Sequence, residues 1–277
     1  MSPRSAGRKR PKLVERLLVK PGSSVHLGDA DASDTFGHDK STAEAATASD
    51  LERLTSLQER IRAEGQRAVL IVLQGIDTAG KDGTIRHVMQ AFNPQGCRVT
   101  SFDIPTALEA RHDHLWRIHA AVPGKGEVGI FNRSQYESVL VVRVHELVPE
   151  ATWRRYYDEI NEFEAILANA GTTVLKFFLH ISRAEQLDRL KARYDDPTKQ
   201  WKFQAGDLAE RARWDDYMAA YQEALSRCST DTAPWYRIPS DHKWFRNLAI
   251  GEIVADRFEA LHPAYPKVDL PKDLLLR

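Results

Sequence analysis

Short apolar segments alternate along the chain with longer segments in which apolar side chains recur at three- and four-residue intervals. The short segments are rich in β-branched and aromatic residues, which is typical of strands. The predicted strands span residues 68–73, 98–102, 128–131, 173–181 and 235–238. The predicted helices span about 43–65, 81–92, 107–121, 150–169, 183–194, 207–227 and 243–261. Because the strands are apolar on both sides, this order predicts an α/β fold, a three-layer sandwich in which helices cover both faces of a parallel sheet.

The two ends of the chain lack this alternation. Residues 1–12 carry five basic side chains and no acidic one, and residues 21–50 are small, polar and glycine-containing. Such composition is typical of segments that cannot build a packed core. We therefore expect a basic, polar N-terminal arm over residues 1–42 that is partly ordered at most. The main domain is expected over residues 43–262, followed by a C-terminal tail over residues 263–277.

The overall composition is that of an ordinary globular protein, with 42% hydrophobic and 28% charged residues among 277. Basic and acidic residues both number 39, so the net charge gives no reason to expect a nucleic-acid partner. Two distant cysteines, Cys97 and Cys228, predict neither a disulfide framework nor a zinc site. Since no apolar run approaches the roughly 20 residues that span a bilayer, we expect a cytoplasmic protein without a membrane partner.

The first predicted strand leads into the segment QGIDTAGKDGT, residues 74–84. It follows the phosphate-binding pattern G-x-x-x-x-G-K-[ST] except at its last position. Gly75 and Gly80 let the backbone amides face one anion, and Lys81, at the start of a helix, adds a mobile positive charge. Placed between a strand and a helix, this pattern predicts phosphate binding by Gly75, Ala79, Gly80, Lys81, Asp82, Gly83 and Thr84.

Two acidic residues distinguish this loop from the usual pattern. Asp77 would repel phosphate unless a divalent cation lay between them, so we predict that it anchors magnesium in place of the missing hydroxyl. Asp82 stands where serine or threonine is usual. It either belongs to the phosphate site or caps the following helix and interacts with its dipole.

A second polar loop follows the third predicted strand, where Asn132 and Arg133 come directly after residues 128–131. Because the carboxyl ends of parallel strands share one edge of a sheet, this loop is expected beside residues 75–83. The Asn132 amide can bind phosphate oxygens or a metal-bound water, although it lacks the charge of a carboxylate. The Arg133 guanidinium suits bidentate binding of phosphate, so we predict Asp77, Lys81 and Arg133 as the catalytic set.

A basic segment, RLKARYDDPTKQWKFQAGD, begins at residue 189. We expect it to form a lid, over about residues 185–210, that closes on a polyanion and excludes water. The substrate-binding side chains predicted in the lid are Arg193, Lys199 and Lys202. Lys243 and Arg246 lie three residues apart on one helix face and add a second basic cluster. The acidic side chains of the segment WDDY, residues 214–217, are expected to pair with the lid's bases rather than to bind metal.

Three histidines, His112, His114 and His119, invite a zinc interpretation. Their spacing does not support it, because the first two point to different sides of a helix and no third ligand is suitably placed. We expect them to cap a helix start and to pack around Trp116.

The phosphate loop resembles that of the polyphosphate kinase type 2 family, in which the pattern is G-x-D-x-x-G-K-D-G. Later segments resemble successive family blocks in the same order, so the resemblance covers about residues 43–261. These segments are HDHLWRIHAAVP, GIFNRSQYESVLVVRVHELVP, DPTKQWKFQAGDLAERARWDDYMAAYQEAL and APWYRIPSDHKWFRNLA. The segment KPGSSVHL, residues 20–27, resembles the N-terminal arm of the branch called class III, which would make part of the arm ordered. The resemblance implies a P-loop kinase-like fold with a helical lid.

The resemblance also implies a reaction, in which a phosphoryl group passes between inorganic polyphosphate and a nucleotide. Class III members accept AMP and ADP, with GDP a further candidate, and Mg²⁺ is the implied cofactor, with Mn²⁺ as an alternative. Arg133 is implied to act in the active site, and Arg117 to contact phosphate or nucleotide. Gln135 and Ser138 stand where the family pattern has histidine and aspartate, so Glu137, and not Ser138, joins Asp77 as an expected metal ligand. A homodimer or homotetramer is also implied.

The expected reaction needs little help from a general base, because the attacking nucleotide oxygen is already anionic near neutral pH. The metal, the loop amides, Lys81 and Arg133 instead cancel charge. Since donor and product both contain phosphoanhydride bonds, we expect a reversible reaction. Two alternatives stay open, an ATP-dependent P-loop nucleotide kinase and a non-catalytic module that binds a nucleotide or a polyanion. Asp82 in place of a hydroxyl side chain argues against the first, and the zero net charge argues against the second.

Overall fold

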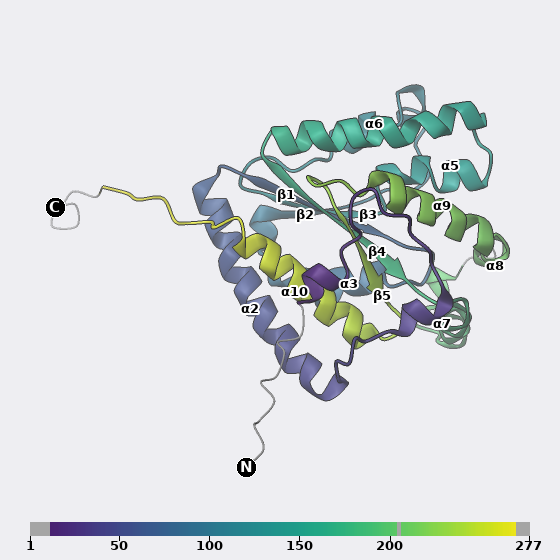
Figure 1. Ribbon diagram of the computed structural model, residues 1–277, viewed down its shortest axis with the longest axis horizontal. Helices are drawn as coiled ribbons and strands as arrows, with labels where there is room; N and C mark the ends of the chain where they lie inside the picture. The colour runs from purple at the N-terminus through teal and green to yellow at the C-terminus, as the bar shows by residue number, and fades with distance from the viewer. Residues whose placement is uncertain (1–11, 204–205, 270–277) are drawn as a thin grey trace, which may run out of the picture.

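Five parallel strands form the centre of the molecule in a computed structural model that describes residues 12–203 and 206–269 (Figure 1). They are β1 (Ala68–Gln74), β2 (Cys97–Ser101), β3 (Val128–Asn132), β4 (Thr172–His180) and β5 (Trp235–Pro239). Their order in the sheet is β2-β3-β1-β4-β5, so β1 lies in the middle. All five strands expected from the apolar segments are present, each with boundaries within one residue of the prediction.

The register brings three polar loops to one edge of the sheet. Leu73 at the end of β1 lies opposite Asn132 at the end of β3, and Gln74 lies opposite Phe178 near the end of β4. The strands are parallel, so the chain leaves all three at the same edge. The phosphate loop therefore begins between the loops that follow β3 and β4.

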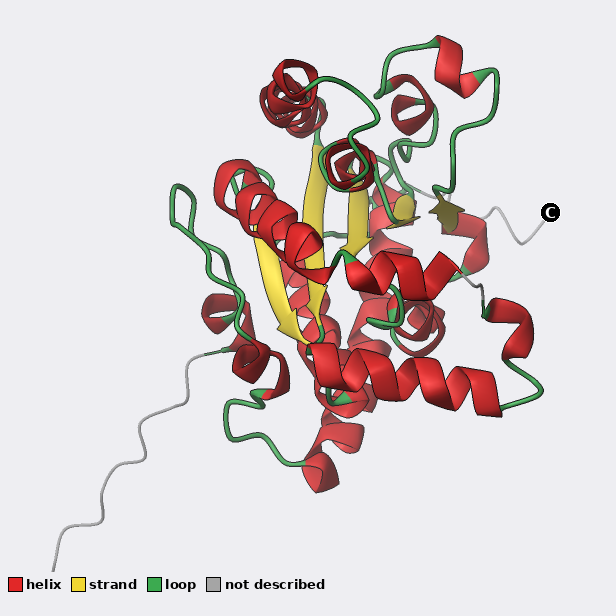
Figure 2. Cartoon of the chain, turned by 90° about the vertical axis from the view of Figure 1, so that its right-hand side faces the viewer, coloured by secondary structure: helices red, strands yellow, loops and turns green. Residues whose placement is uncertain are grey.

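Helices cover both faces of the sheet, as Figure 2 shows by the strands lying between groups of helices. One face is covered by α1 (Leu13–Arg16), α2 (Lys40–Glu64), α3 (Lys81–His87) and α10 (Lys243–Glu259). The other is covered by α5 (Val141–Val144), α6 (Glu150–Asn169) and α9 (Trp214–Cys228). Every residue of β1 is buried, which requires cover on both sides and explains its continuous apolar sequence. The expected three-layer α/β sandwich is confirmed.

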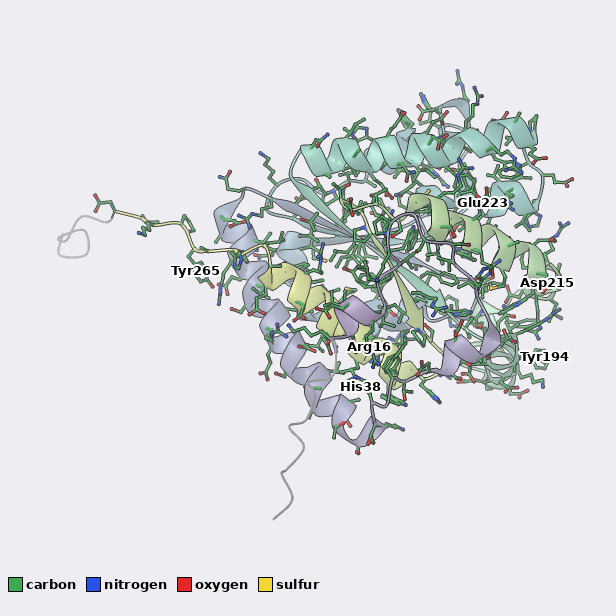
Figure 3. The ribbon with its side chains drawn as sticks, viewed as in Figure 1. Arg16, His38, Tyr194, Asp215, Glu223 and Tyr265 are labelled. Atoms are coloured by element: carbon green, nitrogen blue, oxygen red, sulfur yellow. The ribbon has the colours of Figure 1, made fainter. Side chains whose placement is uncertain are left out.

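Helix α7 (Arg183–Asp195) and helix α8 (Gly206–Ala212) occupy the segment expected to form the lid. Ser182 caps α7, because its side chain accepts a hydrogen bond from the Glu185 amide at 3.2 Å. Tyr194 on α7 and Asp215 on α9 are labelled at the same side of the molecule in Figure 3. Arg183 lies 3.8 Å from Asp215. Within the described residues, the WDDY segment therefore pairs with a base of α7 that precedes the expected lid, and not with one of the lid bases named above.

Three predicted helices are interrupted. The segment 81–92 is helical only to His87, the end of α3, and continues as the 3-10 turn Met89–Ala91. The segment 107–121 contains only a 3-10 turn, Glu109–Arg111, and the short α4 (Trp116–His119). His112 is extended between them, and the Asp113 side chain accepts from the Leu115 amide at 3.0 Å, which starts a new turn. The segment 207–227 is divided between α8 and α9. Further 3-10 turns are Asp29–Ser33, Pro94–Gly96, Gln135–Ser138 and Gln200–Lys202.

Residues 12–39 were expected within a partly ordered arm, but they pack against the domain. Leu13, Leu17 and Val19 are buried in the common core. The Val19 amide donates to Trp235 O at 2.9 Å, and the Arg237 amide donates to Leu17 O at 2.9 Å. This segment therefore covers the edge of β5, where unpaired backbone groups would otherwise remain. Helix α2 begins at Lys40, so residue 42 is not a structural boundary.

The remaining expectations for the chain ends, on residues 1–11 and 270–277, lie outside the described residues. Among the helices of residues 12–203 and 206–269, each is too short or too polar to cross a bilayer.

Candidate active site

The phosphate loop turns sharply between β1 and α3. Gly80 has φ of +112°, in the left-handed region that favours glycine. Gly75 is tightly packed, because a Cβ atom there would lie 2.9 Å from Leu179 O. Lys81 is 9% exposed, and its Nζ donates to Gly75 O at 2.6 Å and to Ile76 O at 3.4 Å. Burial lowers the pKa of the Lys81 ammonium, and the nearby Asp77 carboxylate opposes that change.

Arg133 lies across the mouth of this loop between two carboxylates. Its Nη2 is 3.3 Å from Asp77 Oδ1, and its Nη1 is 3.6 Å from Asp103 Oδ1. Burial acts to lower the pKa of Arg133, but Glu137 and Asp77 raise it overall. Arg133 itself has φ of +63°, which is strained for a residue with a side chain. The structure thus brings together Asp77, Lys81 and Arg133, the predicted catalytic set.

Asn132 and Asp82 are joined directly, since Asn132 Nδ2 donates to Asp82 Oδ1 at 3.1 Å. Asp82 is the second residue of α3, close to the positive end of the helix. The amide at the end of β3 therefore holds the unusual acid of the phosphate loop.

The predicted metal ligands, Asp77 and Glu137, are close enough for the Asp77 charge to affect the pKa of Glu137. Burial raises the pKa of the Glu137 carboxyl, Arg133 and Lys81 oppose the rise, and Asp77 adds to it. Among residues 12–203 and 206–269, no three His, Cys, Asp or Glu side chains are grouped to hold a metal. Two carboxylates fit Mg²⁺, because this ion keeps several waters and commonly binds one or two carboxylates together with substrate phosphates.

Arg246 is a buried cation beside the phosphate loop. It is 2% exposed, and its guanidinium lies against Gly80 and Gly83, where a Cβ atom would stand 1.8 Å and 3.0 Å from its nitrogens. Its side chain donates only to Asn247 Oδ1, at 2.8 and 3.2 Å, within the described chain. Burial, with Arg189 nearby, lowers the pKa of Arg246 to about 10. A buried cation without a carboxylate partner, next to an amide-lined loop, favours an anionic ligand.

The remaining basic residues predicted to bind substrate are Lys243 on α10 and Arg193, Lys199 and Lys202 in the lid segment. Burial, followed by Arg189, lowers the pKa of Lys243, the first residue of α10, and Lys199 contributes to the same effect. Arg193 is 3.6 Å from Asp207, and Lys199 forms an ion pair with Asp196. The Lys202 side chain lies outside the described residues.

Arg117 contacts the backbone of Asp103. Its Nη1 donates to Asp103 O at 2.8 Å and is 3.7 Å from Glu109, and its guanidinium lies 5.5 Å from the centre of the Phe102 ring. Asp103 is therefore contacted by both arginines, by Arg117 at its carbonyl and by Arg133 at its carboxylate.

The two departures from the family pattern have polar partners. Gln135 Nε2 donates to the buried Glu164 Oε1 at 2.9 Å, and Ser138 Oγ lies 3.2 Å from His114 Nδ1. Lys176, a buried lysine inside β4, donates to the other Glu164 oxygen at 2.5 Å. Of the three histidines, only His112 stacks on Trp116 as expected, whereas His114 stacks on Tyr156 and His119 packs edge-on against Phe163. The expected capping role is wrong, because α4 begins after Leu115 without a side-chain cap.

Comparison with known proteins decides the family. The family described as polyphosphate kinase 2 (PPK2) matches residues 37–265, most of the chain. The chain belongs to the polyphosphate kinase 2 family. It is 48% identical over 265 residues to the AMP/ADP-polyphosphate phosphotransferase of Meiothermus ruber, covering 95% of this chain and 99% of the relative. The ADP-polyphosphate phosphotransferase of Rhodopseudomonas palustris is 43% identical, covering 92% of each chain.

A solved polyphosphate kinase 2, the crystal structure from Arthrobacter aurescens TC1, has the same fold. It superposes with a TM-score of 0.90 at 44% identity, covering 94% of both chains. The resemblance seen in the motifs is therefore confirmed over almost the whole chain.

Sequence reasoning missed Asp103 and Lys176 of this polyphosphate kinase 2 family member. Lys176 had a signal, because a single lysine interrupts an apolar strand and requires a buried partner. Asp103 had none in its own segment. Only the strand order, which places β2 next to β3, shows that residue 103 leaves the sheet beside Arg133.

Proposed function

We propose that this protein transfers a phosphoryl group between inorganic polyphosphate and the terminal phosphate of AMP or ADP, with GDP as a further acceptor. The relatives at 48% and 43% identity are named for polyphosphate with AMP/ADP and with ADP. A more distant relative, 37% identical over 206 residues, is named for GDP. The observation that carries the proposal is the buried Arg246, which has no carboxylate partner in the described chain and lies against Gly80 and Gly83 of the phosphate loop.

In this proposal the phosphate loop receives phosphates that carry closely spaced negative charges. Three cations offset these negative charges. Lys81 is bound to Gly75 O, Arg246 lies against Gly80 and Gly83, and Arg133 contacts Asp77. Arg133 exchanges its contact with Asp77 or Asp103 for a phosphate oxygen, since both carboxylates hold it at more than 3 Å. The acceptor oxygen is already anionic, so positioning and charge cancellation supply most of the catalysis.

The proposed metal is Mg²⁺, with Mn²⁺ as an alternative, held by Asp77 and Glu137. When bound, it supplies positive charge between phosphate groups and carboxylates. A cation held by Asp77 would compete with the Asp77–Arg133 contact and would leave the Arg133 guanidinium available to a substrate phosphate. Burial raises the pKa of the Glu137 carboxyl, and a bound cation would oppose that rise by favouring the carboxylate.

The lid segment of α7 and α8 supplies the outer wall in this proposal. Lys199 contributes to lowering the pKa of Lys243, so the lid carries positive charge near the start of α10. In this proposal a chain of phosphates runs from the loop past Lys243 to Lys199. Closure over that chain excludes water, which would otherwise hydrolyse the phosphoanhydride. A homodimer or homotetramer, and a cytoplasmic location where nucleoside mono- and diphosphates are available, complete the proposal.

The test is a direct measurement of products. The protein is incubated with Mg²⁺ and long-chain polyphosphate together with AMP, ADP or GDP, and the nucleotides are separated by chromatography. We expect ADP from AMP and ATP from ADP, and polyphosphate formation when ATP is supplied in excess. Phosphorylation of AMP by ATP without any polyphosphate requirement, or no turnover by folded protein, would contradict the proposal.

A further inference from the structure

Arg189, on the lid helix α7, holds the back of the phosphate loop. Its Nη1 donates to Thr78 O at 2.9 Å and to Ala79 O at 3.2 Å. Its Nη2 donates to Ser240 O at 2.5 Å and to Asp241 O at 2.9 Å, in the loop after β5. The side chain is 9% exposed. One guanidinium therefore joins three separate segments, and these bonds leave it no donor face for a polyanion.

Neighbouring side chains extend this connection to the second lid helix. Glu185 accepts from Arg189 Nε at 2.8 Å, which fixes the plane of the guanidinium. Gln186 Nε2 lies 3.4 Å from Asp77 O, and its Oε1 accepts from Arg211 Nη1, on α8, at 2.6 Å. The carbonyls of three consecutive loop residues are thus bound by α7, and α7 is bound by α8.

The direction of these carbonyls determines where the loop amides point. In a trans peptide the C=O and N–H groups point in opposite directions. The oxygens of Asp77 and Ala79 face α7, so the N–H groups of Thr78 and Gly80 face away from it. Within residues 12–203 and 206–269, neither N–H donates to a protein acceptor, and both are available to an anion.

Thr78 adds a reason why such support is needed. Its φ is +66°, a conformation that a residue with a side chain adopts only when its surroundings impose it. The hydrogen bond from Arg189 to Thr78 O is part of those surroundings.

We propose that Arg189 is a positioning residue for phosphoryl transfer: it orients the amides of the phosphate loop and ties the lid helices to that loop. It acts through the Thr78 and Ala79 carbonyls and does not touch substrate. Lysine cannot replace it, because an ammonium is a single point and cannot bind carbonyls on both sides. The inference rests on the proposed phosphoryl transfer.

The test compares Arg189→Lys and Arg189→Ala with wild type and with Asp188→Asn, a control at a 70% exposed side chain of the same helix. ATP formation from ADP and polyphosphate gives kcat and KM, and thermal unfolding reports the folded fraction. We expect kcat to fall about tenfold to a hundredfold in both Arg189 variants, because small misplacements of a catalytic loop have effects of this size. KM for ADP should change far less, and Asp188→Asn should match wild type. Millimolar guanidinium should restore part of kcat in Arg189→Ala.

A folded Arg189→Lys protein with wild-type kcat would overturn the inference. So would a loss of kcat that follows the folded fraction and is not restored by guanidinium. If Arg189→Ala does not fold, Arg189→Lys decides at a temperature where it is folded. Wild-type protein without polyphosphate-dependent activity would instead contradict the proposed function, which keeps the two failures distinct.

Discussion

Replacing Arg246 with methionine should stabilise the free protein and impair its reaction. The guanidinium is 2% exposed and has no carboxylate partner in the described chain. Burial, followed by Arg189, lowers its pKa from the ordinary arginine value to about 10. That difference corresponds to about 3 kcal/mol of unfavourable free energy for keeping the cation in the folded state.

Whether the Arg246 charge stabilises or destabilises the fold depends on how tightly the folded and unfolded chains bind its proton. The folded pKa lies below the unfolded one, so the unfolded chain holds this proton more tightly, and the penalty is fully present below pH 10. Methionine has a similar length and no charge, so it removes the penalty but also the hydrogen bonds to Asn247. We expect a net gain of about 1–3 kcal/mol, or a rise in Tm on the order of 2 to 6 °C.

The cost of this substitution should appear in catalysis. A preorganised charge donor contributes about 10²- to 10³-fold to turnover in comparable sites, so kcat/KM for polyphosphate should fall by a similar factor. Polyphosphate should also raise the Tm of wild type more than that of Arg246→Met, because only wild type gains a counter-charge.

The assays are thermal unfolding with and without polyphosphate, and initial rates of ATP formation from ADP. Arg257→Met is the matched control, because Arg257 lies in the last turn of the same helix, where a cation is favourable. That variant should show no gain in Tm and unchanged rates. The reasoning would be refuted if Arg246→Met were less stable than wild type without ligand, or if it kept wild-type kcat/KM.

Three further predictions follow from the same structure. Lys81→Ala should remain folded and lose about 10²- to 10³-fold in kcat, because one preorganised charge donor is removed; near-normal turnover would contradict its role. Gly75→Ala should destabilise the fold by about 1–3 kcal/mol, because its Cβ would stand 2.9 Å from Leu179 O. Urea unfolding checks this against Gly206→Ala, whose Cβ meets nothing within 4 Å; equal stability of the two variants would count against the packing argument. Burial, then Arg237, lowers the pKa of His180 to about 4, so the unfolded chain binds a proton between pH 6.5 and 4 that the folded chain does not. Stability should therefore fall by about 3 kcal/mol across that range, and His180→Phe should flatten the profile relative to wild type; parallel profiles would show that His180 does not contribute.

The strands and the phosphate loop could be predicted because their signals are local. The residues of β1 are apolar throughout, and the glycines and lysine of the loop stand at fixed spacings. The break in the predicted helix 107–121 could not be predicted. It depends on the Asp113 side chain, whose hydrogen bond to the Leu115 amide favours a turn over a continuous helix.

The surroundings of the charged residues also could not be predicted from the sequence. In the sequence, Arg246 and Arg189 are both members of basic segments. One lacks a carboxylate partner in the described chain, and the other is bound by four carbonyls, since different parts of the chain surround them. The N-terminal segment was underestimated because its apolar residues, Leu13, Leu17 and Val19, are few and find their partners only at β5.

The most direct test of the account is a crystal structure of the protein with Mg²⁺ and a short polyphosphate. We expect phosphate density in the loop between Lys81 and Arg246, with the cation bound by Asp77. An empty loop, with polyphosphate and cation bound at another surface, would contradict the account.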